Sequence, residues 1–428
     1  MLMKLVAHKK MLMLLTITAS MISSCSRNIG PGNVVEKLPN TVVLQWNEIA
    51  FKAFDGPVYQ HSLMASRINA MMHLAMHDAI NAVYPVYQTY AFTGIDKKAD
   101  VIAAAVSAAH AVLLNEVPAK KSFLDSALNV DLEAIKNPEA KEKGIVLGKQ
   151  AAQAILALRA TDGAAADPIG LIQPSETPGV YNVVPPFNFI FAPFWENVKP
   201  FGLQTKNQFR SVAPPALNSQ AYAAGFLEVK DRGKLNSTTR TADETAYAKF
   251  WYEFSEAGWN RVARVAAANK KLNLFEAARL FALVDMALAD AYIAGWDSKL
   301  YYNFWRPYTA IRAAANDGND ATTADVTWEP SEVTPPIQDY PSTHSVLGNA
   351  GAAVLARLLG DNTAFSMTSF TAVPQGSTRS FTSFSQAANE NASSRVMAGI
   401  HFRFSCSAGQ EMGTQIGNWL VDNYLQPR

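Results

Sequence analysis

The sequence is short of cysteine and has no excess of charge of either sign. Its 428 residues include two cysteines, Cys25 and Cys406, and 37 lysines and arginines against 36 aspartates and glutamates. This balance provides no basic field that would recruit a polynucleotide, so we expect no nucleic-acid partner. Hydrophobic residues make up 49% of the chain and charged residues 17%, which is typical of a globular protein with a large core.

Long hydrophobic runs are also missing, except near the start of the chain. Lys4, Lys9 and Lys10 precede an apolar run at 11–22, and the sequence Ser-Ser-Cys follows at 23–25. A basic stretch, an apolar stretch too short to span a bilayer comfortably, and small residues form the order of a secretory signal. We therefore expect residues 1–24 to be a signal peptide and the protein to be exported.

The residues around Cys25 resemble a bacterial lipobox, with the sequence Ile-Ser-Ser-Cys at 22–25. The resemblance implies cleavage before Cys25, lipid on its thiol and a tether at 25–42; a secreted form without lipid is the alternative. The protein would then be periplasmic or membrane-anchored, with membrane contact only through the lipid. Cys406 would be the remaining thiol, so no intrachain disulfide could form, and we expect it to be a small buried apolar group.

Strand signals are scarce, whereas long stretches rich in Ala, Leu and Met carry apolar residues at the spacings of three and four that helices require. These stretches are 43–54, 61–84, 98–115, 118–133, 137–160, 218–231, 240–269, 274–305, 344–360, 381–403 and 407–425. The pattern predicts an all-α fold of two packed helical bundles, at 43–161 and 216–428.

A segment rich in proline and aromatic residues separates the two predicted bundles. Residues 162–215 include the sequence PSETPGVYNVVPPFNFIFAPFWENVKPFG. Proline removes backbone donors and stops helices, which predicts an extended segment and makes this the best place to divide the chain. Because phenylalanine and tryptophan at this density favour burial, we interpret the segment as a cover rather than a loose linker.

Three short motifs carry the residues that could do chemistry. Lys299 and Arg306 are seven positions apart, which on one helix would place both cations on the same face, about 10 Å apart along the axis. Two such cations suit an oxyanion, since arginine supplies a planar fork and lysine a mobile point charge. The alternative is a solvated basic face.

The second motif is the sequence DYPSTHSVLG at 339–348. Ser342 or Thr343 can cap the helix predicted to follow, and the free N–H groups of its first turn, together with the helix dipole, form an anion site. His344 would lie at the positive helix end, where its neutral form is favoured. Ordinary capping is the alternative.

The third motif is SSRVMAGIHFRFS at 393–405, in which Arg395 and His401 are six positions apart. A helix with an exposed arginine and a core histidine would explain it equally well. However, only two of the seven histidines, His344 and His401, lie beyond residue 110, and both fall inside these motifs.

Taken together, the motifs resemble those of the phosphatidic acid phosphatase type 2 / vanadium haloperoxidase superfamily. The order K-x6-RP, PS-x-H, SR-x5-H is present as Lys299, Arg306-Pro307, Pro341-Ser342-Thr343-His344, and Ser394-Arg395 with His401. Stretches such as MMHLAMHDAINAV and ADAYIAGWDSKLYYNFWRPYTAIR resemble the bacterial vanadium-dependent haloperoxidase branch, and the resemblance extends over about residues 40–425.

The resemblance implies a site for vanadate and a role for each matching residue. His401 would bind the vanadium, and the oxyanion would be held by Lys299, Arg306, Ser342, Thr343 through its backbone N–H, Arg395 and His401. His344 would be the acid–base group that takes a proton from hydrogen peroxide, and Lys299 would polarise the bound peroxide for attack by halide. Trp296 matches an aromatic wall near the halide.

The chain departs from the family pattern at two positions. Thr343 stands where the family usually has glycine, so it either keeps a normal helical N–H in place or narrows the pocket. Ser405 stands where the superfamily often has aspartate, which predicts that His401 loses an orienting acceptor. Such a loss would harm a nucleophilic histidine more than a vanadate ligand, which favours the peroxidase over the phosphatase.

Two further groups are weaker candidates. His73 and His77 are four positions apart, a spacing that can bind zinc, but no third ligand is evident and core hydrogen bonding is the preferred interpretation. Residues 236–244 indicate a loop and a helix cap, although Thr239, Arg240 and Asp243 could approach the cleft.

The sequence therefore predicts a vanadate-dependent haloperoxidase that oxidises halide with hydrogen peroxide to hypohalous acid. The organic acceptor of the halogen is not predicted. One alternative is an acid phosphatase, with His401 as nucleophile and His344 as the acid for the leaving group. A second is a non-catalytic lipoprotein that binds oxyanions.

Overall fold

The structure is a computed structural model, and it describes residues 35–56 and 61–428. The predicted signal peptide, and the part of the predicted tether at 25–34, lie outside these residues. Residues 35–40 lead into the first described helix and lie beside the start of a later one, where the N–H of Leu274 donates to the Leu38 carbonyl over 2.9 Å.

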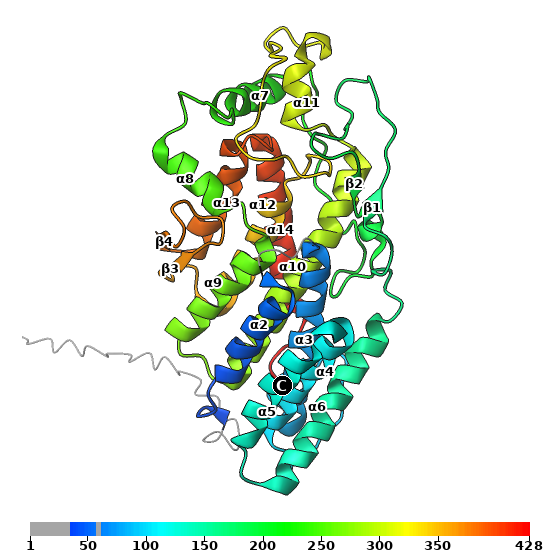
Figure 1. Cartoon of the computed structure of the whole chain (residues 1–428), viewed down its shortest axis with the longest axis vertical. Coiled ribbons are helices and arrows are strands. Elements are labelled where there is room, and N and C mark those ends of the chain that lie inside the picture. The colour runs from blue at the N-terminus through cyan, green and yellow to red at the C-terminus, as the bar shows by residue number, and fades with distance from the viewer. Residues whose placement is uncertain (1–34, 57–60) are drawn as a thin grey trace, which may run out of the picture.

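The prediction of an all-α fold is confirmed, because helices account for nearly all regular structure in the described residues (Figure 1). The α-helices are α2 (Thr41–Ala53), α3 (Ser62–Val83), α4 (Val101–Glu116), α5 (Lys121–Glu133), α6 (Pro138–Arg159), α7 (Gln220–Arg232), α8 (Ala242–Phe250), α9 (Ser255–Asn269), α10 (Leu274–Tyr302), α11 (Pro307–Arg312), α12 (Thr343–Leu359), α13 (Phe384–Met397) and α14 (Arg403–Asn423). Two small antiparallel sheets pair β1 (Ile169–Gly170) with β2 (Ile190–Phe191), and β3 (Phe365–Thr368) with β4 (Thr378–Phe381).

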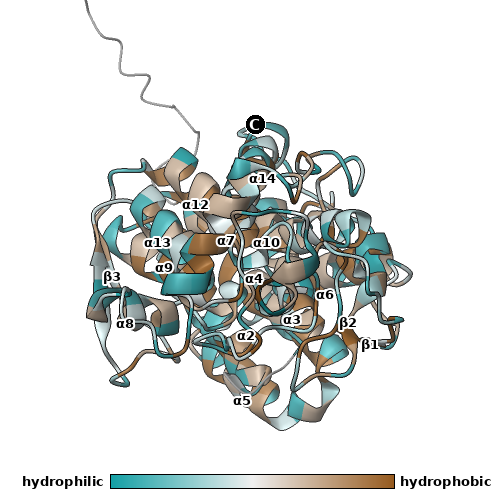
Figure 2. Cartoon of the chain, turned by 90° about the horizontal axis from the view of Figure 1, so that it is seen from above, coloured by the Kyte–Doolittle hydropathy of each residue, from teal (hydrophilic) through white to brown (hydrophobic). Residues whose placement is uncertain are grey.

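Helix α10 is the central element of the fold. It contacts α2, α3, α9, α12 and α14, and in Figure 1 it runs between the group formed by α4, α5 and α6 and the group formed by α12, α13 and α14. One cluster of buried apolar residues extends through both groups, and a smaller one surrounds Tyr222, Phe304 and Trp328. In Figure 2 the hydrophilic residues gather toward the outside of the molecule. None of the helices in the described ranges is long and apolar enough to cross a bilayer.

Side-chain caps explain where several of these helices begin. Asn273 and Glu276 form a reciprocal capping box at the start of α10, and Thr241 and Glu244 form another at the start of α8. Asn137 caps α6 ahead of a proline in the first turn.

Three predicted helices end earlier than their apolar patterns indicate. The segment 240–269 forms two helices, α8 and α9, because Phe254 has extended backbone (φ −62°, ψ 133°). The segment 274–305 stops at Tyr302, since Asn303 adopts the left-handed conformation (φ 45°). The segment 381–403 stops at Met397, and Gly399 follows with φ 80°. Each break lies beside the site described below.

The segment at 162–215 is fixed to the helices by buried polar contacts. The Asp290 carboxylate on α10 accepts the N–H groups of Phe201, Gly202 and Leu203 over 2.6 to 2.9 Å. Trp195 in the same segment is 1% exposed. The prediction that its aromatic residues are buried is therefore confirmed for Trp195, whereas the division of the chain at this segment stays a prediction.

A close approach of α14 to the start of α12 sets the position of the second motif. A Cβ atom at Gly409 of α14 would lie 2.7 Å from the carbonyl oxygen of Ser342, a distance that side chains do not tolerate. The N–H of Ser342 donates to the carbonyl of Ser405 over 2.9 Å. Glycine thus allows α14 to hold the first residues of α12.

Candidate active site

Helix α12 begins at Thr343, and its first turn faces a cavity. Ser342 is the N-cap residue by position, but its side chain makes no capping hydrogen bond, so the expectation that this hydroxyl caps the helix is wrong. Thr343 is the first helical residue, and its backbone N–H consequently has no acceptor within the helix. Because φ is not positive at Thr343, the backbone there does not require glycine. Thr343 lines the cavity.

Lys299 and Arg306 do not lie on one helix, contrary to the prediction. Lys299 is in the last turn of α10, the chain leaves that helix at Asn303, and Arg306 is the N-cap residue of α11. The two cations nevertheless both donate to the backbone of residues 337–339. The Lys299 Nζ donates to the carbonyls of Gln338 and Asp339 over 2.7 and 3.0 Å, and the Arg306 Nε donates to the carbonyl of Ile337 over 2.7 Å.

His401 lies between α13 and α14, in the turn opened by Gly399. The Arg306 Nη1 donates to the carbonyl of Ile400 over 2.7 Å and lies 3.0 Å from the Nε2 of His401. The His401 Nδ1, on the other side of the ring, lies 2.8 Å from Asp339 Oδ1. This contact is electrostatic rather than an aligned hydrogen bond, because Oδ1 has no aligned donor in the described part of the chain. The ring therefore presents Nε2 to the cations.

Asp339 corrects the expectation that His401 has no orienting carboxylate. Ser405, which replaces the expected aspartate, donates its hydroxyl to Asp339 Oδ2. The carboxylate therefore comes from the residue three positions before Ser342, and the serine holds it in place. Burial raises the pKa of Asp339 to about 7, although the nearby Arg306 guanidinium lowers it.

His344 lines the cavity from the first turn of α12. Its Nε2 lies 3.0 Å from the carbonyl oxygen of Glu253. Since a carbonyl can only accept, Nε2 carries the proton and Nδ1 is left as an acceptor. Burial, and then the positive charge of Arg395, hold the pKa of His344 well below its usual value. In the absence of an anion this imidazole is neutral.

Arg395 completes the group of buried cations. Its Nη1 donates to the carbonyl of Trp251 over 3.2 Å, whereas its Nε has no hydrogen-bond partner among the described residues. Burial lowers the pKa of Arg395 to about 10. Burial and the neighbouring Arg306 charge hold the pKa of Lys299 well below its usual value. Burial is the largest cause of both shifts, and the charge of Arg306 lowers both pKa values further, which indicates that the three cations lie close together.

The structure thus brings together the six residues Lys299, Arg306, Ser342, Thr343, Arg395 and His401, which we call the anion cradle. Three observations fit a tetrahedral oxyanion such as vanadate. Three buried cations, Lys299, Arg306 and Arg395, lie near His401, the Arg395 Nε has no partner within the described residues, and Thr343 offers a free N–H at the positive end of α12. The negative charge of a bound oxyanion would offset the positive charges of Arg306 and Arg395, which lower the pKa of Lys299.

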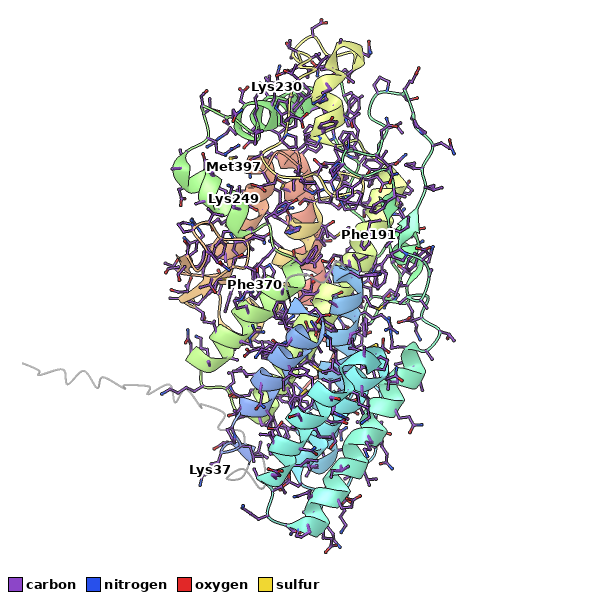
Figure 3. All side chains as sticks on the ribbon, viewed as in Figure 1. Lys37, Phe191, Lys230, Lys249, Phe370 and Met397 are labelled. Carbon is purple, nitrogen blue, oxygen red and sulfur yellow. The ribbon has the colours of Figure 1, made fainter. Side chains whose placement is uncertain are left out.

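The cradle opens into a cavity of about 550 Å³. Trp296, predicted as a wall of the halide pocket, is 3% exposed and lines this cavity, and its Nε1 donates to the carbonyl of Phe191 over 3.2 Å. Phe191 and Phe370, both labelled in Figure 3, come from distant parts of the chain and line the same cavity.

Glu256 in the cavity wall gives a prediction about pH and stability. Burial raises its pKa from 4.5 to about 8, so between these values the unfolded chain is ionised while the folded protein keeps the proton. Stability should therefore fall as pH rises through this window, by up to about 1.4 kcal/mol per pH unit. Glu256→Gln should remove this pH dependence. In denaturant unfolding, the free energy of unfolding of the variant should therefore rise relative to that of the wild type between pH 5.5 and 7.5. Parallel curves for the two proteins would contradict a neutral Glu256.

The weaker candidates lie away from the cradle. His73 Nδ1 lies 2.6 Å from Asp285 Oδ2, and His77 Nδ1 lies 3.3 Å from Asp78 Oδ1. Within 35–56 and 61–428, no cluster of three or more His, Cys, Asp or Glu side chains could hold a metal ion. Cys406 is buried, as predicted.

The suggestion that Thr239, Arg240 and Asp243 approach the cleft is wrong. Arg240 donates to the carbonyls of Arg232, Lys234 and Met397, and Asp243 pairs with Arg379. None of the three predicted residues lines the cavity.

Two comparisons of sequence relate the chain to known proteins. A family model described as the VCPO second helical-bundle domain matches residues 279–427, which contain the whole cradle. The chain is 24% identical to the vanadium chloroperoxidase of Curvularia inaequalis over an alignment 506 positions long, which covers 88% of this chain and 81% of that protein.

Solved structures are similar over most of their length. The crystal structure of the first bacterial vanadium-dependent iodoperoxidase superimposes with a TM-score of 0.79 at 26% identity, covering 91% of this chain and 97% of the other. The holo form of a bacterial vanadium-dependent chloroperoxidase superimposes with a TM-score of 0.68 at 16% identity, covering 84% and 91% of the two chains. At that identity the second likeness concerns the fold alone.

Proposed function

Because this chain belongs to the vanadium-dependent haloperoxidase family, we propose that it binds vanadate in the anion cradle and oxidises halide with hydrogen peroxide to hypohalous acid. The observation that carries the proposal is the cradle itself. Three buried cations, a free helix N-terminus and the Nε2 of His401 converge where a tetrahedral oxyanion would bind.

When bound, vanadate would supply a Lewis-acidic centre that activates hydrogen peroxide toward attack by halide. The chain's own residues hold and neutralise that group. Lys299 uses two of its three N–H donors on the carbonyls of Gln338 and Asp339, which leaves one for a ligand. Arg306 commits Nε and Nη1 to backbone carbonyls, and its Nη2 makes no hydrogen bond within the described residues. Each cation is thereby positioned while part of it stays available.

His344 is placed to move a proton. The carbonyl of Glu253 keeps the hydrogen on Nε2, so Nδ1 can accept a proton from hydrogen peroxide. The cations of the cradle oppose a positive charge on this ring. A bound oxyanion would offset them and make His344 a stronger base.

An acid phosphatase is the second candidate, and Asp339 is the observation that favours it. A carboxylate 2.8 Å from His401 Nδ1 is what a nucleophilic histidine needs, so the absence of aspartate at position 405 no longer argues against hydrolysis. The non-catalytic alternative assumed that Thr343 and Ser405, the two departures from the family pattern, remove the geometry that catalysis needs. It has less support, because Thr343 is helical and Ser405 supports Asp339.

One assay separates these functions. We expect the purified apo-protein to oxidise iodide or bromide with hydrogen peroxide only after vanadate is added, and phosphate to inhibit this reaction by competing for the cradle. The same protein should be tested for hydrolysis of a phosphate ester. A lack of halide oxidation in the presence of vanadate would refute the haloperoxidase. Hydrolysis that vanadate inhibits would establish the phosphatase, and tight binding without turnover would favour the non-catalytic alternative.

Export and lipid attachment at Cys25 are proposals that rest on the sequence of residues 1–25 alone. The intact mass of the protein extracted from membranes decides between a lipidated and an unmodified N-terminus.

A further inference from the structure

The connection between α8 and α9 contacts the candidate site through its backbone. It consists of residues 251–254, between the end of α8 at Phe250 and the start of α9 at Ser255. The carbonyl of Trp251 accepts the Arg395 Nη1, and the carbonyl of Glu253 lies 3.0 Å from the His344 Nε2. These residues belong to none of the three motifs, so a fourth stretch of the chain takes part in the site.

The Glu253 carbonyl is not fixed by the hydrogen bonds of a helix. The first carbonyl that α9 uses is that of Phe254, which accepts the N–H groups of Ala257 and Gly258 over 3.1 and 3.2 Å. The Glu253 carbonyl precedes it in a short connection, where the backbone is more mobile than in a helix unless other contacts hold it. Its place beside His344 therefore depends on what holds residue 253.

The side chain of Glu253 supplies that fixation. Arg261 Nη1 donates to its Oε1 over 2.7 Å and Arg261 Nη2 to its Oε2 over 3.2 Å, while the N–H of Phe370 also donates to Oε2 over 3.2 Å. The residue is 6% exposed. A Cβ atom at Gly258 would lie 3.0 Å from Oε1, so α9 leaves room for the carboxylate at that position. Both carboxylate oxygens are thus held by donors from other segments.

Arg261 is itself held in place by several contacts. Its Nη1 donates to the carbonyl of Thr368 over 2.8 Å, and its guanidinium carbon lies 4.3 Å from the centre of the Phe370 ring. Phe370 stacks on Phe51 of α2 with the ring centres 5.0 Å apart. The carboxylate of Glu253 is consequently attached to a rigid group of side chains from α9, α2 and the segment after β3.

Stability alone is a weak reason for this buried ion pair. Removing two charges from water costs about as much as their attraction returns, and apolar residues of similar size often stabilise a protein equally well. The pair is placed on the one residue whose own carbonyl contacts His344. Its position therefore points to a role in the site.

The side chain and the carbonyl of Glu253 move together because they share one Cα atom. A shift of the carbonyl by about 1 Å would lengthen its 3.0 Å contact with His344 beyond hydrogen-bond range. The neutral imidazole could then carry its proton on either nitrogen. In molecules with the proton on Nδ1, that nitrogen could not accept a proton from hydrogen peroxide.

We propose that Glu253 is a positioning residue whose carboxylate, held by Arg261 and the N–H of Phe370, fixes its own carbonyl on His344. This contact keeps the Nδ1 of His344 free to accept a proton. The proposal rests on the proposed function, which assigns the proton transfer to His344.

The tautomer of His344 tests the proposal without the catalytic reaction. The apo-protein is labelled with ¹⁵N-histidine, and the His344 ring signals are identified by their loss in His344→Gln. We expect one neutral tautomer in the wild type, with the proton on Nε2, and a mixture of both tautomers in Glu253→Ala. A single Nε2–H tautomer in folded Glu253→Ala would overturn the proposal.

Two further variants test the contact if Glu253→Ala does not fold. Glu253→Gln keeps the shape and one acceptor oxygen, so its share of the Nε2–H tautomer should be close to that of the wild type. Arg261→Ala removes two donors to the carboxylate and should admit the second tautomer. A wild-type tautomer in Arg261→Ala would mean that the ion pair does not act on His344.

Glu116→Gln is the matched control. Glu116 accepts the Arg67 Nη1 over 3.0 Å at the end of α4, and it does not line the cavity. This variant should leave the His344 tautomer unchanged even if its thermal midpoint falls. Were it to admit the second tautomer as Glu253→Ala does, the effect would reflect general loss of stability, contrary to the proposal.

Phosphate binding and kinetics separate a role at His344 from a role in the cradle. Glu253→Ala should bind inorganic phosphate, measured by calorimetry, with nearly the affinity of the wild type, and its kcat for iodide oxidation with vanadate should fall about tenfold. A large loss of phosphate affinity would show that Glu253 supports the whole site instead of His344. If the wild type oxidises no halide, the proposed function fails, whereas the tautomer in the apo-protein still decides whether Glu253 positions His344.

Discussion

His401→Ala is expected to remove vanadate binding and, with it, halide oxidation. The Nε2 of His401 faces Arg306 in the cradle and is the uncharged nitrogen available to bond the metal. Loss of a partner that merely orients a metal ligand typically costs 10–100-fold in affinity, so loss of the ligand itself should cost more than about 100-fold. Affinity is measured on the protein with vanadate alone, by vanadium NMR or calorimetry, and activity by the oxidation of iodide.

A matched control is His110→Gln. His110 lies on α4, away from the cradle, and its Nε2 is 2.8 Å from Asp125. This variant should bind vanadate as the wild type does. If His401→Ala keeps wild-type affinity and activity while its thermal midpoint is unchanged, the site is misassigned.

Asp339→Ala should weaken vanadate binding by about 10–100-fold although Asp339 would not touch the oxyanion. Its carboxylate lies 2.8 Å from His401 Nδ1, so its removal frees the ring to turn away from the cradle. Asp339→Asn keeps the shape but not the charge, and its affinity should fall between those of Asp339→Ala and the wild type. Ser405→Ala should have a smaller effect in the same direction, since it removes one donor to that carboxylate.

A variant of a different buried aspartate serves as the control. It separates a role of Asp339 in positioning His401 from a general loss of stability. Asp317 is 6% exposed and accepts the hydroxyl of Thr322 over 2.7 Å, but it does not line the cavity. Asp317→Asn should lower the thermal midpoint and leave vanadate affinity unchanged. Should Asp339→Asn and Asp317→Asn change affinity equally, Asp339 has a structural role only.

The sequence predicted most of the helices and named the residues of the cradle. It did not predict from which elements the chain brings those residues together. Apolar spacing predicts helices well because α10 and its neighbours are long and buried. It does not predict where they end. Asn303 and Gly399 end helices because their backbone is left-handed, whereas the apolar pattern continues beyond both residues. The two cations and His401 therefore meet from separate elements rather than along a common helix face.

The sequence did not indicate Asp339, because the family pattern places the carboxylate at position 405. The residue lies in the second motif, three positions before Ser342, but only the packing of α14 against α12 brings it to His401 and Ser405. The serine at position 405 was the available signal, since a buried histidine without its usual carboxylate indicates that another residue supplies one. Glu256 gave no signal, because polar residues in apolar helices usually serve the core.

The covering segment has a consequence for how this enzyme can change. The cradle is encoded at 299–306, 339–344 and 395–405, whereas the wall at 187–191 comes from a separate stretch between the two groups of helices. Replacing Phe187 or Phe189 would reshape this wall of the cavity without replacing Lys299, Arg306 or His401. Substitutions in the covering segment can therefore change the wall of the cavity while the residues of the anion cradle keep their positions on other stretches of the chain.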